Sequence, residues 1–135
     1  MIIRKLYRFE AAHIVRNCSS DRCRLSVHGH SFRCELLLSA DRPVRGQMVY
    51  DFGLLKRHVK EFLDGFDHAT LFWEREKPAY AAAMKEHSQR WVQLPVSPTA
   101  EQLSRVIFVA AQALLDNTER ANGDQAARVH SVLLH

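Results

Sequence analysis

The residues of this chain best suited to chemistry are three histidines placed so that they could bind one metal ion. His28 and His30 flank Gly29 in a segment of alternating polar and apolar side chains, so both imidazoles point to one face of a strand. His13 ends an earlier alternating segment, on its apolar face. Three histidine ligands with one open position are typical of catalytic zinc, which polarises a substrate oxygen. Ordinary surface or core histidines are the alternative interpretation.

A cysteine close to these histidines adds a second kind of reactive group. Cys23 precedes His28 in a loop rich in turn-forming residues. A thiolate beside zinc or an imidazolium has a lowered pKa and can act as a base or a nucleophile. A zinc ligand or an inert thiol is the alternative, and Cys18 in the same loop is a rival for the reactive role. Cys34 lies on the apolar face of its strand, so we expect it in the core.

Asp67 and His68 form a possible acid–base pair. An aspartate can fix the tautomer and orientation of a catalytic histidine. The side chains of two consecutive residues point the same way only where the chain bends. The alternative interpretation is therefore that Asp67 and His68 are polar residues at the end of a helix, without a catalytic role. His58, His87, His130 and His135 carry no such pattern and are left outside the predicted site.

Strands and helices that would position these groups follow from periodicity. We expect strands at Ile2–Ala12, His28–Ala40 and Ala126–Leu134, the last entered through a turn at Asn122-Gly123-Asp124. The segment 15–27 is expected to be an irregular loop.

The expected helices have recognisable starts. Asp51 is expected to cap a helix with an apolar stripe ending near Phe66. Thr99 with Gln102 resembles a capping box at the start of a second long helix. A short helix is expected at Pro78–Gln89. This order predicts an α+β domain with helices on one face of a mostly antiparallel sheet. Three strands make a thin sheet, so we expect either a further strand near Val44–Tyr50 or Trp91–Val96, or sheets joined between subunits.

Composition limits the function classes. The 135 residues fit one domain, residues 1–135, with 47% hydrophobic and 25% charged residues. No apolar run approaches the roughly 20 residues that span a bilayer, and the N-terminus lacks the apolar stretch of a signal peptide. An odd cysteine count argues against a full set of disulfides. We therefore expect a cytoplasmic protein without a membrane partner.

The net charge of +4 is modest, and the arginines are scattered through the chain. A nucleic-acid surface is normally more clustered, so no nucleic-acid partner is expected. An anionic small substrate explains the charge equally well. Arg16, Arg22 and Arg24 are close to the site in sequence, but no phosphate contact is assigned to them.

Five stretches together resemble the 6-pyruvoyltetrahydropterin synthase family, which includes bacterial 6-carboxytetrahydropterin synthases. They occur in family order and span nearly the whole chain: Phe9-Glu10-Ala11-Ala12-His13, Cys23 through His28-Gly29-His30-Ser31-Phe32, Met48 through Lys56, Phe66-Asp67-His68, and Ser97-Pro98-Thr99-Ala100-Glu101. No single stretch is specific, whereas the set is.

The resemblance implies a T-fold, an antiparallel sheet with two main helices on one face, whose subunits join sheets into a barrel as a homo-oligomer (trimer or hexamer). It implies Zn²⁺ held by His13, His28 and His30. It also implies catalysis by Cys23, Asp67 and His68 and places Thr99 and Glu101 near the substrate.

The implied reaction converts 7,8-dihydroneopterin triphosphate into 6-carboxy-5,6,7,8-tetrahydropterin, a precursor of queuosine, with release of acetaldehyde and triphosphate. Formation of 6-pyruvoyltetrahydropterin and an aldol cleavage on the same fold are alternatives. A non-catalytic metal- or pterin-binding protein is an alternative of another class.

The chain departs from the family at two places. The segment Trp73–Arg90 is longer than the usual connection, so we expect a lid or an assembly element there. The family also carries a glutamate just after its last strand that grips the pterin ring. This sequence ends at Leu133-Leu134-His135, where that residue is expected next, and whether the C-terminal end is truncated is left open.

Overall fold

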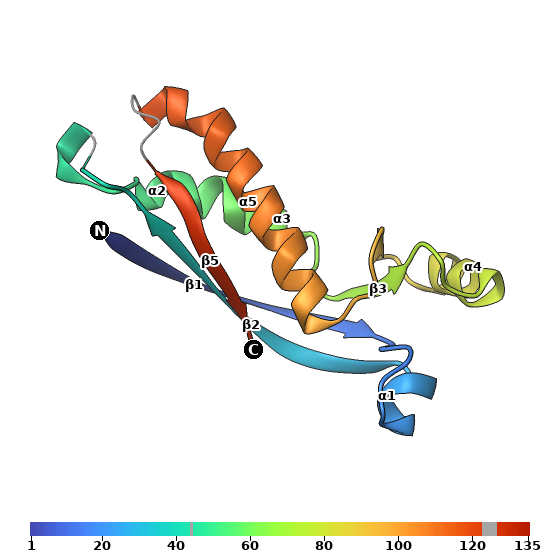
Figure 1. The fold of residues 1–135 in the computed structure, drawn as a ribbon. Coiled ribbons are helices and arrows are strands. Elements are labelled where there is room, and N and C mark those ends of the chain that lie inside the picture. The colour runs from blue at the N-terminus through green and yellow to red at the C-terminus, as the bar shows by residue number, and fades with distance from the viewer. Residues whose placement is uncertain (44, 123–126) are drawn as a thin grey trace.

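The protein is built on a five-stranded mixed sheet, seen in a computed structural model that describes residues 1–43, 45–122 and 127–135 (Figure 1). The strand order is β4-β3-β1-β2-β5. The strands are β1 (Ile2–His13), β2 (His28–Ser39), β3 (Ala69–Trp73), β4 (Trp91–Leu94) and β5 (Arg128–Leu134). Strands β1, β2 and β5 pair antiparallel, whereas β3 runs parallel to β1 and β4 runs parallel to β3.

Two long helical segments pack on one face of this sheet (Figure 1). The first combines α2 (Phe52–Leu54), the π-helical turn η2 (Leu55–Val59) and α3 (Lys60–Asp64). Asp51 caps it as expected, because its Oδ1 accepts a hydrogen bond from the Gly53 amide at 2.7 Å. The second is α5 (Ala100–Asn122), which leaves Leu103, Ile107, Ala111 and Leu115 buried at helical spacing.

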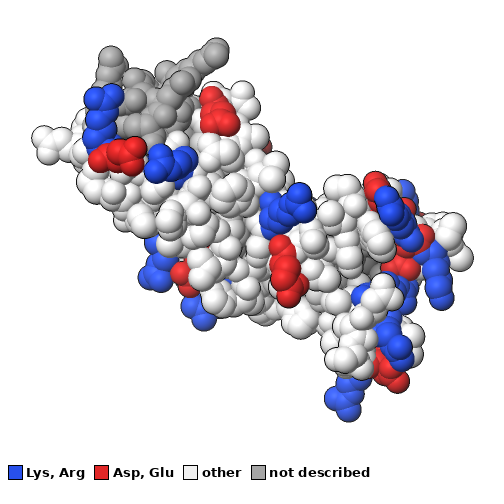
Figure 2. Space-filling view, viewed as in Figure 1, with Lys and Arg blue, Asp and Glu red and all other residues white. Residues whose placement is uncertain are grey.

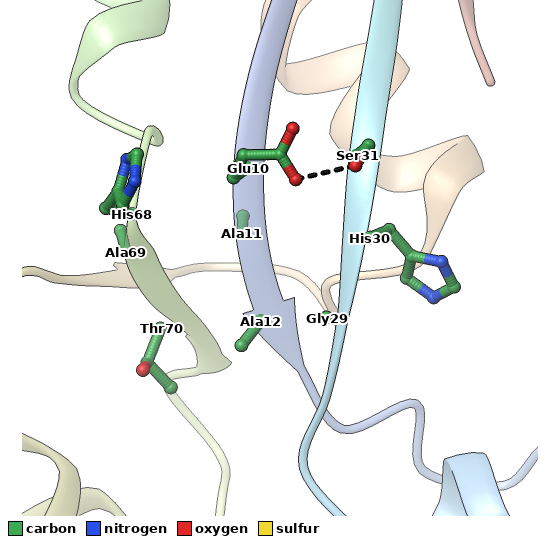
Figure 3. A pocket seen from close by; sticks show the side chains of 9 residues that line it. All are labelled: Glu10, Ala11, Ala12, Gly29, His30, Ser31, His68, Ala69 and Thr70. Atoms are coloured by element: carbon green, nitrogen blue, oxygen red, sulfur yellow. Dashed lines mark hydrogen bonds between the residues drawn. The ribbon is translucent and has the colours of Figure 1, made fainter.

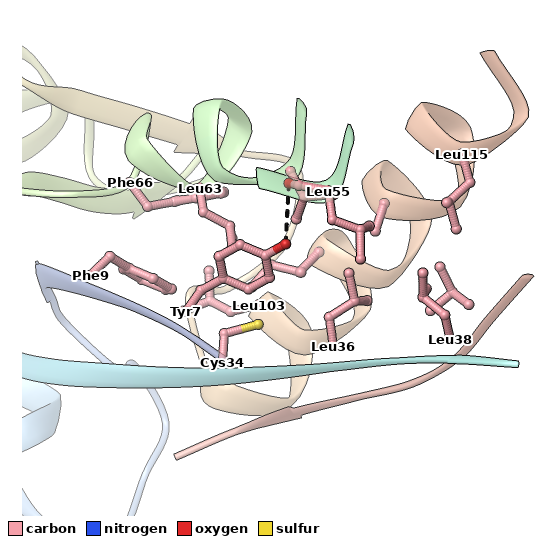
Figure 4. Packing of buried hydrophobic residues seen from close by; sticks show 14 of the residues in the cluster. Tyr7, Phe9, Cys34, Leu36, Leu38, Leu55, Leu63, Phe66, Leu103 and Leu115 are labelled. Atoms are coloured by element: carbon pink, nitrogen blue, oxygen red, sulfur yellow. Dashed lines mark hydrogen bonds between the residues drawn. The ribbon is translucent and has the colours of Figure 1, made fainter. Parts of the chain in front are cut away.

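The core lies between these helices and the sheet face that carries the odd-numbered residues of β1 (Figure 4). Tyr7, Phe9 and Ala11 are buried there, and the matching β2 residues Phe32, Cys34, Leu36 and Leu38 are buried too. The alternation predicted for both strands is therefore confirmed. Burial raises the pKa of the Cys34 thiol to about 12, so this cysteine is a core residue, as expected, and not a reactive one.

Three short elements complete the fold: α1 (Asp21–Leu25), the 3-10 turn η1 (Arg45–Gln47) and α4 (Pro78–His87). The predicted short helix is thus present, and the loop 15–27 contains one helical turn that periodicity did not indicate. Figure 1 shows α4 beyond β3, at a distance from α3 and α5.

Two parallel strands of the same chain, β3 and β4, widen the sheet beyond the three strands that the sequence predicted. The expectation of a strand near Trp91–Val96 is confirmed by β4, and β3 is a strand that we did not predict. The alternative near Val44–Tyr50 is wrong for the described residues of that segment, which contain η1 and no strand. Gly123 and Asp124 of the predicted turn and Ala126 of the predicted strand lie outside the described residues.

The surface offers no stripe of one charge on the face seen in Figure 2, where acidic and basic side chains lie interspersed among uncharged ones. Among the described helices, none has the length and apolarity needed to cross a membrane. Both observations agree with the modest charge and the ordinary composition of the sequence.

Candidate metal centre and active site

The antiparallel pairing of β1 and β2 brings the three predicted metal ligands together. His13 lies opposite His28 in the register, and Ala11 lies opposite His30. The ring centroid of His13 lies 4.6 Å from that of His28 and 5.1 Å from that of His30. The centroids of His28 and His30 are 5.0 Å apart. One ligand nitrogen from each ring lies within 4.8 Å of the other two.

His13 has the hydrogen bonding expected of a metal ligand. Its Nδ1 lies 2.6 Å from the Pro98 carbonyl oxygen, which only accepts, so Nδ1 carries the proton and Nε2 presents its lone pair. That Nε2 is buried and has no hydrogen-bond partner among the described residues. A buried imidazole nitrogen without a partner is costly unless something such as a cation occupies its lone pair.

The remaining two histidines complete the donor set. The Nδ1 of His28 lies 3.1 Å from the Ser26 carbonyl oxygen, which leaves its Nε2 for a metal. His30 is exposed, and its ring lies beside those of His13 and His28. Zinc–nitrogen bonds near 2.0–2.1 Å imply nitrogens about 3.4 Å apart in a tetrahedral site. Three imidazole nitrogens within 4.8 Å of one another, one of them buried without a partner among the described residues, fit a zinc ion.

A cavity of about 490 Å³ opens beside this triad and contains most of the other predicted site residues. Its walls include both candidate cysteines, Cys18 and Cys23, together with Thr99 and Glu101. The Cys18 thiol lies 3.4 Å from the Ser20 carbonyl oxygen, within its own loop. Both thiols therefore border one space with the histidines.

Thr99 and Glu101 lie where α5 begins. The Thr99 hydroxyl accepts a hydrogen bond from the Gln102 amide at 3.3 Å, which confirms the predicted cap. The reciprocal bond of a capping box is not formed, since the Gln102 Oε1 is buried without a partner among the described residues. Hydrogen bonds from its own amide and from Thr99 hold the pKa of Glu101 below its ordinary value.

Asp67 and His68 form the predicted pair. The Nδ1 of His68 lies 2.8 Å from Oδ2 of Asp67, and the His68 backbone is left-handed at φ 58°, which supplies the required bend. The Glu10 amide donates to the other Asp67 oxygen at 2.7 Å. These two hydrogen bonds, the amide first, hold the pKa of Asp67 below its ordinary value, so it is an anion near neutral pH.

His68 of this pair lines a second cavity, of about 330 Å³, rather than the one with the cysteines (Figure 3). Glu10 and Ser31 line the same cavity and point toward each other in Figure 3, where the Ser31 hydroxyl donates to Glu10 at 2.7 Å. His30 borders both cavities, but its ring points away from His68 in Figure 3. Within one chain, the structure does not bring Cys23 and His68 to one cavity.

Sequence reasoning missed Glu10 and Ser31 as site residues. They lie opposite each other in the β1–β2 register, on the face away from the core. Their signal is a polar pair directly beside the histidine segment, at an even position in β1 and an odd position in β2. It becomes readable only once the register of the two strands is known.

The mixed sheet with helices on one face defines an α+β protein, and three histidines beside two thiols form its candidate metal site. Comparison with known proteins then gives the family. The pattern of the 6-pyruvoyl tetrahydropterin synthase family matches residues 2–135, and the chain belongs to that family.

Relatives of known name agree with this assignment. A protein of Helicobacter pylori (strain J99) named 6-carboxy-5,6,7,8-tetrahydropterin synthase is 34% identical over 135 residues, covering 100% of this chain and 68% of that protein. A Rickettsia felis protein with the same name is 28% identical over 97 residues, covering 71% of this chain and 69% of that protein.

Solved structures share the fold. An uncharacterized protein from Wolinella succinogenes superposes with a TM-score of 0.74 at 17% identity, covering 100% of this chain and 92% of that one. The 6-pyruvoyl tetrahydropterin synthase of Caenorhabditis elegans gives 0.63 at 18% identity, covering 100% and 94%. The T-fold predicted from the motifs is thereby confirmed.

Proposed function

We propose that this chain is a zinc-dependent 6-carboxy-5,6,7,8-tetrahydropterin synthase. It would convert 7,8-dihydroneopterin triphosphate into 6-carboxy-5,6,7,8-tetrahydropterin, acetaldehyde and triphosphate, a step toward queuosine. The observation that carries this proposal is the buried, unpartnered Nε2 of His13 facing two further histidines in a chain whose full length matches a relative of that name.

His13, His28 and His30 would hold the zinc ion. When bound, zinc supplies Lewis acidity toward a hydroxyl of the substrate side chain. The Pro98 carbonyl keeps the His13 ring in the tautomer that presents Nε2. Thr99 and Glu101, which border the same cavity, would bind the substrate, with the Glu101 carboxylate accepting hydrogen bonds from the pterin.

Proton transfer falls to the other three residues. Cys23, half-buried in the cavity wall, would take a proton from the substrate side chain. Asp67 accepts from the Nδ1 of His68 and so leaves the His68 Nε2 to exchange a proton with solvent or substrate. A thiol and an imidazole acting on opposite sides of one carbon would give a base and an acid for the same step.

A homo-oligomer would complete this site. In the described chain, β3 covers only Ala11–His13 of β1, so the edge of β1 that precedes them lies without a strand neighbour on that side. Such an edge pairs readily with a strand from another chain. An assembly built on open edges, as a trimer or hexamer, would bring the Asp67–His68 pair of one subunit beside the Cys23 cavity of another.

The test is turnover by purified, zinc-loaded protein. Incubation with 7,8-dihydroneopterin triphosphate is expected to yield 6-carboxytetrahydropterin and acetaldehyde, identified by mass spectrometry. A product of the mass of 6-pyruvoyltetrahydropterin would reassign the reaction within the family. Zinc-loaded protein that binds the substrate without turnover would point to a non-catalytic pterin-binding protein.

A further inference from the structure

A largely buried ion pair connects the loop that carries Cys18 and Cys23 to the segment that precedes α4. The Arg16 Nε lies 3.1 and 3.0 Å from the two carboxylate oxygens of Glu76, and the Arg16 Nη2 lies 2.9 Å from Oε1. The Glu76 side chain is 6% exposed and that of Arg16 is 24% exposed. A buried contact with several hydrogen bonds constrains both side chains in direction as well as in distance.

The same guanidinium fastens the two limbs of the cysteine loop (residues 15–27) to each other. Its Nη1 donates to the Arg24 carbonyl oxygen at 3.0 Å, while the Val15 amide donates to the Cys23 carbonyl oxygen at 3.0 Å. Two consecutive residues at the start of the loop, Val15 and Arg16, thus bond two consecutive residues within α1, Cys23 and Arg24. The backbone of Cys23 is held directly by one of these bonds and through its neighbour by the other.

Glu76 is in turn fixed to the end of β3, because its backbone amide donates to the Trp73 carbonyl oxygen at 3.0 Å. It accepts a hydrogen bond from the Lys77 amide at 2.9 Å, at the start of α4. Tyr80 of α4 lies under the Arg16 guanidinium at 5.7 Å and edge-on to Phe72 of β3 at 6.5 Å. Farther along α4, Lys85 lies 4.8 Å above the Trp91 ring of β4.

These contacts give the long connection between β3 and β4 a role. It is packed on the sheet whose strand β1 carries His13, so Glu76 has a fixed position relative to the histidine triad. Arg16, which bonds both Glu76 and the Arg24 carbonyl oxygen, holds the cysteine loop against Glu76. The Nε, Nη1 and Nη2 of Arg16 all have partners within the protein, although Arg16 borders the cavity, which argues against a role for it in gripping triphosphate.

We propose that Arg16 and Glu76 are positioning residues, which hold the Cys23 thiol at its working place beside the metal triad. This inference rests on the proposed function for its catalytic readout only. It predicts that loss of the pair lowers kcat more than it changes KM, since the substrate contacts at Thr99 and Glu101 are untouched.

The test compares zinc-loaded Glu76→Gln with a matched control, Glu74→Gln, which alters an exposed residue of the same segment. Turnover of 7,8-dihydroneopterin triphosphate, zinc content and iodoacetamide alkylation are measured, with peptide mapping to separate Cys23 from Cys18. We expect kcat to fall about tenfold to hundredfold, as misplacement of a reacting group does. KM should stay within about threefold and zinc should be retained, while Cys23 is alkylated at least about threefold faster.

Removal of one member of a buried pair can unfold a protein, so a second variant keeps the proposal testable. Arg16→Met with Glu76→Met restores packing without charge but lacks the bond to the Arg24 carbonyl, and the same changes in kcat and alkylation are expected. Wild-type kcat and alkylation in this double variant would overturn the proposal, as would a loss of zinc that accounts for the loss of rate. Absence of turnover in the wild-type protein would refute the proposed function instead, with alkylation still testing the positioning.

Discussion

The imidazole of His13 donates from Nδ1 to the carbonyl oxygen of Pro98 at 2.6 Å. This bond joins the end of β1 to the residues just before α5 and leaves the buried Nε2 to face His28 and His30. Burial is the largest cause that lowers the pKa of His13; the Pro98 carbonyl raises it, and the two neighbouring histidines lower it further. The ring is therefore neutral near pH 7, the state in which it binds a metal.

The first prediction concerns pH and stability without metal. Because the unfolded chain protonates His13 near its ordinary pKa of about 6.5 and the folded chain does so only at lower pH, stability falls as pH drops below that value. His13→Gln should flatten the pH dependence of urea unfolding of the metal-free protein between about pH 7.5 and 5. His87→Gln, at an exposed helical position, should keep the wild-type slope. An equal slope in His13→Gln would contradict this account of the ring.

Replacement of the two loop cysteines separates their roles. Cys23→Ala should lower kcat by about 10²–10⁴-fold, the usual contribution of a positioned acid or base. Zinc content should be unchanged, because the three histidines supply the ligands. Cys18→Ala should stay within about threefold of wild type, since that thiol bonds within its own loop. Steady-state kinetics with metal analysis checks both, and the reverse ranking would move the catalytic role to Cys18.

Asp67→Asn tests the acid–base pair. The variant should keep an acceptor for the Glu10 amide but lose the charge that orients His68 and stabilises its protonated form, so kcat should fall about 10²–10⁴-fold. Asp64→Asn, an exposed acid at the end of α3, is the matched control and should behave as wild type. If kcat for Asp67→Asn equals that of the control, Asp67 and His68 have only a structural role at the end of the helix.

Local patterns in the sequence predicted the strands that carry the metal triad. Odd-numbered apolar residues in β1 and even-numbered ones in β2 fixed which face each strand buries, and hence that His13, His28 and His30 share a face. Asp51 and Thr99 were recognisable because a helix start needs an oxygen to accept from its free amides.

The features that sequence did not reveal depend on contacts between distant residues. The short strand β3 has five residues, three of them buried, and no regular alternation that would mark it as a strand. The Arg16–Glu76 pair joins residues 60 positions apart in the chain, so the sequence marked Arg16 only as an arginine near the site and did not indicate its partner. The separation of His68 from Cys23 into two cavities likewise follows from the sheet order, which no local pattern encodes.

The most direct test of the account is the zinc content of purified protein after equilibration with zinc and removal of the free ion. Wild type should retain one zinc ion per chain, as a three-histidine site does. His13→Ala, His28→Ala and His30→Ala should each lose it, while His87→Ala keeps it. Wild-type protein that takes up no zinc, or single histidine variants that bind it as wild type does, would contradict the claim that these three imidazoles form one metal centre.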